Sequence, residues 1–199
     1  MLPSKTCYSE KKFNRIQCPQ VAENLECEMA IIGGGLAGLS LAYQLAQHGQ
    51  RFILIESERI GDCASGINGG ICSPGWAVDY ATLVRQYGSK VANDFYNLSL
   101  EGVQWVHSFK NKIGFRLADF NIGTMNLSLL KSESSAYEAY LKEDLIIQNE
   151  YKFISKEELA NFVKSPFYHS GMLSKSGFSF NPLTFLEALK NQINLLRPK

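Results

Sequence analysis

The chain has few residues of the kinds that build metal sites and disulfide frameworks. Its 199 residues include only three histidines and five cysteines. The histidines (His48, His107 and His169) are far apart in the sequence, and no two cysteines show C-x-x-C spacing. This pattern predicts neither a metal site nor a set of structural disulfides, and reduced cysteines are usual in the cytosol. A G-x-S-x-G elbow, which would indicate a serine hydrolase, is also absent from the sequence.

Long apolar runs and blocks of like charge are also missing. Lysine and arginine number 20 and aspartate and glutamate 19, so the formal net charge is +1. A balance of this kind gives no reason to expect nucleic acid or an anionic membrane surface as a partner. The apolar runs are far shorter than a membrane span, and the N-terminus lacks the apolar segment of a secretory signal. We therefore expect a cytoplasmic protein without a membrane span.

The most informative stretch covers residues 29–56. It begins with an apolar run, residues 29–32, turns through three glycines, and continues with helical spacing as far as His48. Gly49 then stops the pattern, and a second apolar run leads to Glu56. Four apolar residues without alternation are typical of a strand buried on both faces. The order predicts strand, glycine turn, helix, second strand and a terminal carboxylate.

Three glycines of the turn each have a physical reason. Gly33 allows a tight turn, Gly35 lets a pyrophosphate approach the backbone, and Gly38 lets the helix lie close to the strand. The helix N-terminus offers unpaired N–H groups and a positive dipole end to phosphates. Glu56 follows at the distance where a carboxylate accepts hydrogen bonds from ribose hydroxyls, and its charge argues against NADP. No Lys-Ser or Lys-Thr follows the glycines, which excludes a P-loop.

A second glycine-rich stretch follows between residues 61 and 75, with five glycines. So many glycines weaken regular structure, and we expect none here. Such a segment suits close approach of the backbone to a flat or phosphorylated ligand. A flexible surface loop is the alternative, and the residues of this stretch alone leave both readings open.

Helical spacing predicts most of the remaining elements. A short helix is expected over residues 79–87 and a long one over 89–112, with Gly102 allowing close packing. One helix is expected over 133–147. The predicted inward residues of these helices are Val91, Phe95, Leu98, Val106, Phe109, Tyr137, Tyr140, Leu141 and Leu145.

Strand and capping signals complete the prediction. Strands are expected within residues 115–130 and at 151–154, 172–173 and 177–180. Ser155 opens a capping box, and Asn181 followed by Pro182 predicts the start of the last helix. The expected core residues of these two helices are Leu159, Phe162, Val163, Leu186, Leu189, Ile193 and Leu196.

Together, residues 29–56 and the segment Gly-Asp-Cys-Ala-Ser-Gly-Ile-Asn-Gly-Gly at 61–70 resemble the N-terminal part of FAD-dependent oxidoreductases of the D-amino-acid oxidase superfamily. The greatest likeness is to the bacterial branch of gamma-glutamylputrescine oxidoreductase-like enzymes. The stretch 176–183 also resembles the family's entry into its next helix. The resemblance extends loosely over residues 29–197 and is specific at the two glycine segments.

The resemblance implies a fold and a cofactor site. It implies an α/β fold, with a Rossmann-like FAD-binding domain and the beginning of an α+β substrate domain. Glu56 would bind the adenosine ribose, and two groups of residues would bind the rest of FAD. The pyrophosphate would be held by Gly33, Gly35, Leu36, Ala37 and Gly38, and the pyrophosphate and flavin side would be lined by Ala64, Ser65, Asn68, Gly69, Gly70 and Ile71.

The implied reaction is oxidation of the C–N bond of an amine or amino acid, which would be the small-molecule substrate. Hydride passes from carbon to flavin, the imine is hydrolysed, and the flavin is reoxidised, commonly by oxygen. No catalytic residue is assigned, because the family often works without a base. Near the flavin, Cys63 and Cys72 are expected to be buried structural thiols.

The expected organisation has four parts. Residues 1–27 form a lead-in, 28–112 the FAD-binding domain, 113–180 a partial substrate domain, and 181–199 a helix returning toward the FAD domain. Family members continue well beyond this point, so the chain is expected to be truncated and to have little oxidase activity alone. Two alternatives stay open: a non-catalytic remnant, or one half of a split flavoenzyme with a separate C-terminal half. An NAD-binding module is a third reading, which leaves the second glycine stretch unexplained.

Overall fold

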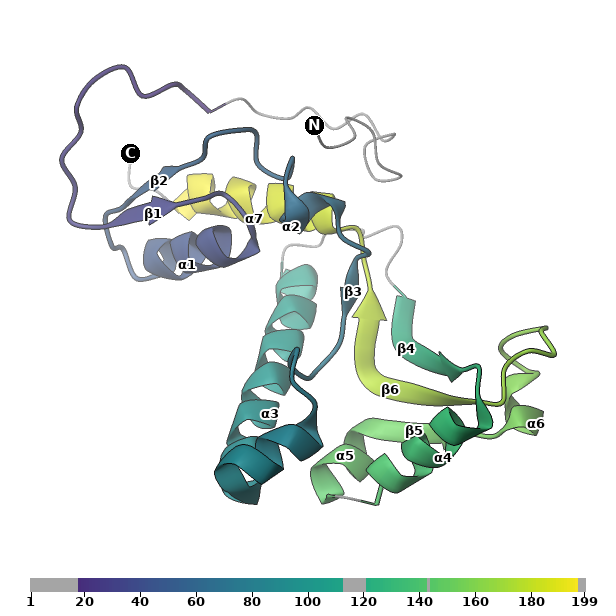
Figure 1. The fold of residues 1–199 in the computed structure, drawn as a ribbon. Coiled ribbons are helices and arrows are strands. Elements are labelled where there is room, and N and C mark those ends of the chain that lie inside the picture. Colours follow the sequence, from purple (N-terminus) through teal and green to yellow (C-terminus); the bar gives the residue numbers. More distant parts are fainter. Residues whose placement is uncertain (1–17, 113–120, 143, 197–199) are drawn as a thin grey trace. The chain divides into compact units, whose positions relative to one another are not determined.

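The computed structural model describes residues 18–112, 121–142 and 144–196. They divide into two compact units (Figure 1). Unit 1 contains the described residues up to Gly70 and from Phe180 onward, and unit 2 contains those from Ile71 to Ser179. Helices and strands occur in both, which confirms the predicted mixed α/β fold class.

Unit 1 contains the predicted strand–turn–helix–strand. Strand β1 (Ala30–Ile32) leads through the glycine turn into α1 (Leu36–Gln47), and β2 (Ile53–Ile55) follows. The two strands pair in parallel, with Ala30 opposite Ile53. Only Ile31 of β1 is buried, whereas Ala30 and Ile32 are exposed. The prediction that this strand is buried on both faces is therefore wrong. Among the described residues, only the face of β1 that carries Ile31 is covered.

Helix α7 (Pro182–Leu196) completes unit 1 and packs against α1 and the short helix α2 (Ala64–Ile67). Its predicted start is confirmed, because the Asn181 side-chain oxygen accepts a hydrogen bond of 3.1 Å from the Thr184 amide. Of its four expected core residues only Leu196 is exposed. The unit's core is formed by Leu39, Ala42, Tyr43, Ala46, Leu183, Leu186, Leu189 and Ile193.

Unit 2 is built around the long strand β6 (Ser170–Ser179). On one side it pairs with β4 (Asn121–Ser128), and on the other with β3 (Ile71–Cys72) and β5 (Tyr151–Ile154). All three pairings are antiparallel, and the strand curves along its length (Figure 1). The sequence predicted two short strands here, because Lys175 and Ser176 interrupt the apolar pattern. The part of the strand prediction that falls on residues 115–120 lies outside the described residues.

Helix α3 (Tyr80–Lys112) combines the two helices predicted for this region, with non-helical backbone at Gly88. The period was predicted correctly, but the buried face is offset from the predicted one. Val91, Phe95 and Leu98 are exposed, whereas Ala92 and Tyr96 are buried. Of the five predicted inward residues Phe109 is buried. Apolar residues occur on both faces of this helix, so spacing alone could not select the face that packs.

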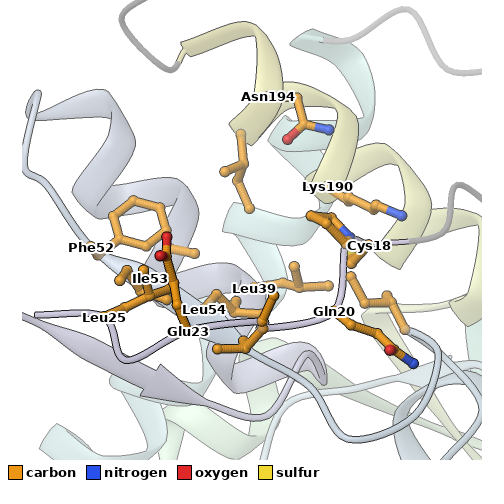
Figure 2. A pocket seen from close by; sticks show the side chains of 16 residues that line it. Cys18, Gln20, Glu23, Leu25, Leu39, Phe52, Ile53, Leu54, Lys190 and Asn194 are labelled. Carbon is orange, nitrogen blue, oxygen red and sulfur yellow. The ribbon is translucent and has the colours of Figure 1, made fainter. Parts of the chain in front are cut away.

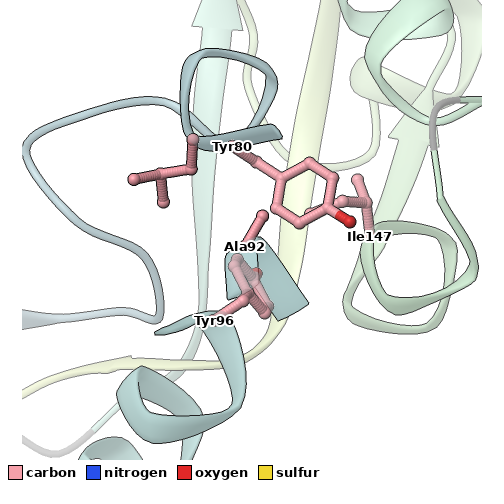
Figure 3. Packing of buried hydrophobic residues seen from close by; sticks show 5 residues of the cluster. Tyr80, Ala92, Tyr96 and Ile147 are labelled. Carbon is pink, nitrogen blue, oxygen red and sulfur yellow. The ribbon is translucent and has the colours of Figure 1, made fainter. Parts of the chain in front are cut away.

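The buried face of α3 contributes to a cluster with Ile147 (Figure 3). The rings of Tyr80 and Tyr96 meet edge to face, with centroids 6.1 Å apart. The Tyr80 hydroxyl donates a hydrogen bond of 2.8 Å to Asp144. This cluster joins α3 to the segment that precedes β5.

The helix predicted over residues 133–147 is two helices, α4 (Lys131–Tyr140) and α5 (Leu145–Glu150). Asp144 caps α5 by accepting a hydrogen bond from the Ile146 amide. This cap starts a new helix, turning Ile147 inward and leaving Leu145 exposed. The capping box at Ser155 is confirmed, although α6 (Lys156–Leu159) is short and Phe162 is exposed.

The compact units change after Gly70 and after Ser179, whereas the predicted parts change after residues 112 and 180. Helix α3 clusters with the β6 sheet, on which it packs, and not with the glycine turn. The chain enters unit 2 after Gly70 and leaves it after Ser179. The assignment of a cofactor domain and a substrate domain stays a prediction.

Two glycines of α3 allow a matched test of the helix. A Cβ would meet no neighbour at either Gly88 or Gly102, but only Gly88 has a positive φ, 81°. The predicted close packing at Gly102 is therefore wrong. We expect Gly102→Ala to raise the free energy of unfolding by about 0.5–1 kcal/mol. Gly88→Ala should lower it by about 1–3 kcal/mol, since its backbone is strained for other residues. Urea unfolding followed by circular dichroism measures both, and equal effects would contradict the described kink.

Candidate functional site

The glycine turn brings the first turn of α1 against the end of β1. Gly33 has φ of +101°, and its amide donates a hydrogen bond of 2.7 Å to the Ile55 carbonyl. A Cβ on Gly38 would stand 2.0 Å from the Gly33 carbonyl oxygen. No side chain fits in that space, so the helix and strand approach more closely than any other residue would permit.

The N-terminus of α1 points its amides at a polar group supplied by α2. Gly35 is the N-cap and offers no capping side chain. The Leu36 amide instead donates a hydrogen bond of 3.1 Å to the Ser65 hydroxyl. A Cβ on Gly35 would lie 2.8 Å from this hydroxyl oxygen, so the approach also depends on glycine. The Ser65 oxygen occupies the kind of position that an anion oxygen takes at a helix N-terminus.

The carboxylate of Glu56 closes the other side of the turn. Its Oε2 accepts a hydrogen bond of 2.7 Å from the Gly34 amide, and its Oε1 accepts one of 3.0 Å from the Glu58 amide. The hydrogen bond from the Glu58 amide is the main cause that lowers the pKa of Glu56, with Gly34 and Ser57 adding to it. Glu56 is thus ionised at neutral pH. A carboxylate has about four acceptor positions, so capacity remains for hydroxyl donors of a ligand.

The second glycine stretch is more ordered than predicted. Residues 64–67 form α2, a helix that the sequence does not predict. Asn68 holds the following turn, because its side-chain nitrogen donates to the carbonyls of Ala64 and Ser65 while its oxygen accepts from the Gly70 amide at 2.8 Å. A Cβ on Gly66 would stand 2.1 Å from the Gly61 carbonyl oxygen. That glycine therefore serves close packing of the backbone on itself.

The described hydrogen bonds bring Glu56 and Ser65 to the glycine turn, and their assignment to FAD stays a prediction. Ile71 belongs to unit 2, whereas the other predicted site residues belong to unit 1. Two residues were missed. The Gly34 amide donates a hydrogen bond to Glu56. Gly61 has φ of +85° and packs on Leu183 so closely that a Cβ at this position would lie 2.4 Å from the Leu183 side chain. The signal for Gly34 was available, because it stands between two residues assigned to the phosphate.

These features fit the pyrophosphate and ribose of a dinucleotide. Among the described residues, no atom lies within 4 Å of a would-be Cβ at Gly33 or Gly69, so the backbone there is open to a ligand. Amides at a helix N-terminus and an ionised carboxylate at the end of β2 supply complementary groups. The residues that could hold the phosphates are Gly33, Gly35, Leu36, Ala37, Gly38 and Ser65.

The cysteines differ in their surroundings. The Cys72 thiol is partly buried, which raises its pKa to about 11 and makes it a poor nucleophile at neutral pH. Cys63 is exposed, so the expectation of a buried thiol is wrong there. The four cysteines in the described part of the chain form no disulfide.

The residues that the structure describes contain no group of His, Cys, Asp and Glu side chains able to hold a metal ion. No helix within them is long and apolar enough to cross a bilayer.

Unit 1 also contains a cavity of about 530 Å³. Figure 2 shows it between α7, with Lys190 and Asn194, and the Phe52–Leu54 side of β2. Residues 18–25 of the lead-in contribute another wall. Its lining contains none of the residues from Gly33 to Gly38.

A pair of glycine substitutions tests the packing of the turn. Gly38→Ala should destabilise unit 1 by at least about 2 kcal/mol, because the added methyl overlaps the Gly33 carbonyl. Gly69→Ala is the matched control and should change stability by less than about 0.5 kcal/mol, since its Cβ meets no atom within 4 Å. Thermal unfolding of the variants measures both. A Gly38→Ala protein as stable as the control would show that α1 is not held this closely.

The chain matches known proteins over most of its length. Residues 28–196 match the family described as FAD dependent oxidoreductase (DAO). The chain is 23% identical over 189 residues to the probable oxidoreductase OrdL of Haemophilus influenzae, covering 91% of this chain and 42% of that protein. It is 27% identical over 168 residues to the gamma-glutamylputrescine oxidoreductase of Escherichia coli, covering 81% of this chain and 38% of that protein.

Solved structures agree on the fold. The L-amino acid deaminase from Proteus vulgaris superposes with a TM-score of 0.69 at 13% identity, covering 91% of this chain and 40% of that one. The chain thus spans about 40% of the length of the relatives it resembles. Its family match covers most of its own length, and the family is FAD-dependent. This chain belongs to the FAD dependent oxidoreductase (DAO) family.

Proposed function

We propose that this chain holds the adenosine and pyrophosphate part of FAD for an oxidoreductase that oxidises the C–N bond of an amine or amino acid. The observation that carries the proposal is the arrangement around α1. The Gly34 amide donates to Glu56, and the Leu36 amide donates to Ser65. Both amides belong to a turn that only glycine can form. The family match over residues 28–196 supports FAD as the dinucleotide.

The residues of the chain would each have a defined part. The Glu56 carboxylate, kept ionised by its backbone hydrogen bonds, accepts from ribose hydroxyls. The first-turn amides of α1 and the Ser65 hydroxyl bind phosphate oxygens, and Asn68 fixes the turn that presents them. FAD, when bound, supplies the hydride acceptor. No residue of this chain is assigned as a catalytic base.

We infer that turnover needs further polypeptide, which a separate C-terminal half could supply. Among the described residues, β1 and β2 form a parallel sheet of two strands. Ile32 and Ile55 on these strands are exposed, as is Leu41 of α1. A parallel sheet is normally covered on both faces, and unpaired edges are open to further strands. The chain alone would then have little or no oxidase activity, and measurable turnover of an amine substrate by it would contradict this inference.

The alternative of an NAD-binding module has less support. Glu56 would suit the ribose of either dinucleotide. The family match and the ordered segment around Asn68, which such a module does not require, favour FAD. Competition between FAD and NAD for the purified chain separates the two readings.

The cofactor proposal predicts a flavin that stays with the purified chain. After incubation with FAD and gel filtration, the protein fraction should keep the visible absorbance of flavin, and excess NAD should not displace it. We expect Glu56→Ala to weaken FAD binding by about tenfold, since a hydrogen bond to a charged group contributes about 1.5–3 kcal/mol. Glu58→Ala is the matched control, because that exposed neighbour contributes only its backbone amide to the site. If both variants bound FAD with equal affinity, the Glu56 side chain would not be part of the binding site.

A further inference from the structure

A second candidate site lies in unit 2, in a cavity of about 390 Å³ between α3 and the β6 sheet. That volume lies in the range of small-molecule sites. The lining combines an apolar floor with polar side chains, and none of its described residues is acidic. The floor consists of Val103, Ile122 and Phe178, and the polar residues are Gln104, His107, Ser108, Lys175 and Ser176.

A bulge in β6 presents two of the polar residues to this cavity. Ile122 pairs with Phe178 and Thr124 with Ser174, so three residues of β6 oppose the single Gly123 of β4. Lys175 and Ser176 belong to these three residues. Bulges of this kind redirect side chains and are frequent beside functional sites.

A buried carboxylate holds the bulge in place. Oε1 of Glu150 accepts a hydrogen bond of 3.0 Å from the Ser176 amide and another from the Ser174 hydroxyl. The same hydroxyl accepts a hydrogen bond of 3.0 Å from the Gly177 amide. Glu150 is not among the lining residues, and its negative charge is engaged by these donors.

The Ser176 hydroxyl is one of two buried side-chain groups, with the Tyr96 hydroxyl, that have no hydrogen-bond partner in the described part of the chain. Its oxygen is buried and makes no hydrogen bond with the described residues. Leaving a buried hydroxyl unsatisfied costs about 1–3 kcal/mol, so such groups usually bind water or a ligand. Ser176 is part of the bulge that Glu150 fixes, so this hydroxyl is held in position at the cavity.

The opposite wall adds donors from one face of α3. Gln104, His107 and Ser108 are spaced i, i+3 and i+4, which places them on the same side of the helix. The His107 ring meets Phe178 edge-on, with centroids 6.0 Å apart. The Lys175 ammonium donates hydrogen bonds of 2.6 Å to the Asn149 carbonyl and 3.5 Å to the Gln148 carbonyl, and neither of these residues lines the cavity. An ammonium has three donors, so one remains for a ligand.

We propose that this cavity binds a small organic anion. The carboxylate or phosphate group of the ligand accepts hydrogen bonds from Ser176 and Gln104 and interacts with the Lys175 ammonium. Its apolar part packs on Val103 and Phe178. The site lies within unit 2 and uses none of the residues assigned to FAD, so it does not depend on the proposed cofactor function.

The test uses the whole 199-residue chain, labelled with 13C at histidine. Its three histidines give a simple spectrum, in which His107→Asn identifies the resonance at the cavity. The probes are benzoate, phenyl phosphate and the neutral benzamide. We expect saturable movement of the His107 resonance with an anion, and not with benzamide, while His48 and His169 stay unchanged. The anion that binds with the higher affinity shows whether the site prefers a carboxylate or a phosphate group.

Variants decide whether the bulge is responsible. Ser176→Ala and Lys175→Met should each weaken binding of the anion by at least about fivefold. The melting temperature of Ser176→Ala should be as high as that of the unmodified chain. The matched controls, Ser135→Ala and Lys164→Met, alter exposed residues outside the lining and should keep the affinity within about twofold. The proposal is overturned if neither anion moves His107 saturably, if all three histidines move together, or if the bulge variants bind as the controls do.

Discussion

The close contact between Gly38 and the Gly33 carbonyl is the constraint on which the candidate cofactor site depends. The space left for a Cβ is so small that the first turn of α1 can lie against the end of β1 only with glycine at position 38. This contact fixes where the helix N-terminus points. The Gly33 amide, which donates to the Ile55 carbonyl, ties the same turn to β2. Strand, helix and second strand are thereby held in one arrangement around the phosphate position.

Two side chains from outside the turn complete the site. Glu56 and Ser65 each accept a hydrogen bond from a backbone amide of the turn, so they order it and also supply groups that suit a dinucleotide. Asn68 gives the second glycine segment a fixed shape. The segment assigned to phosphate and flavin is thus an ordered part of unit 1 as far as Gly70.

Local signals were sufficient for the parts of the fold that depend on neighbours in the sequence. The spacing of glycines, the apolar runs and the acidic residue predicted β1, α1, β2 and Glu56, and the Asn181–Pro182 pair predicted the start of α7. Each of these follows from backbone chemistry within a few residues. The assignment of Ser65 to the cofactor site came from the family resemblance, and its hydrogen bond with the Leu36 amide, across 29 residues, was not predicted.

Predictions failed where tertiary packing decides between equal local choices. Helix α3 carries apolar residues on both faces, so only its partners select Ala92 and Tyr96 over Val91 and Phe95. The break between α4 and α5 depends on the Asp144 cap, whose carboxylate also receives the Tyr80 hydroxyl from a distant part of the chain. The bulge in β6 depends on Glu150, which lies 24 residues before Ser174.

The most direct test of the central claim is an amide NMR titration of the 15N-labelled chain with FAD. We predict the largest shifts at the amides of Gly34, Leu36 and Ala37, with smaller ones at Glu58, whose amide bonds to Glu56. An equal concentration of riboflavin, which lacks the pyrophosphate and adenosine, should leave these amides unchanged. Shifts confined to other residues, or equal shifts with riboflavin, would contradict binding of the pyrophosphate at the N-terminus of α1.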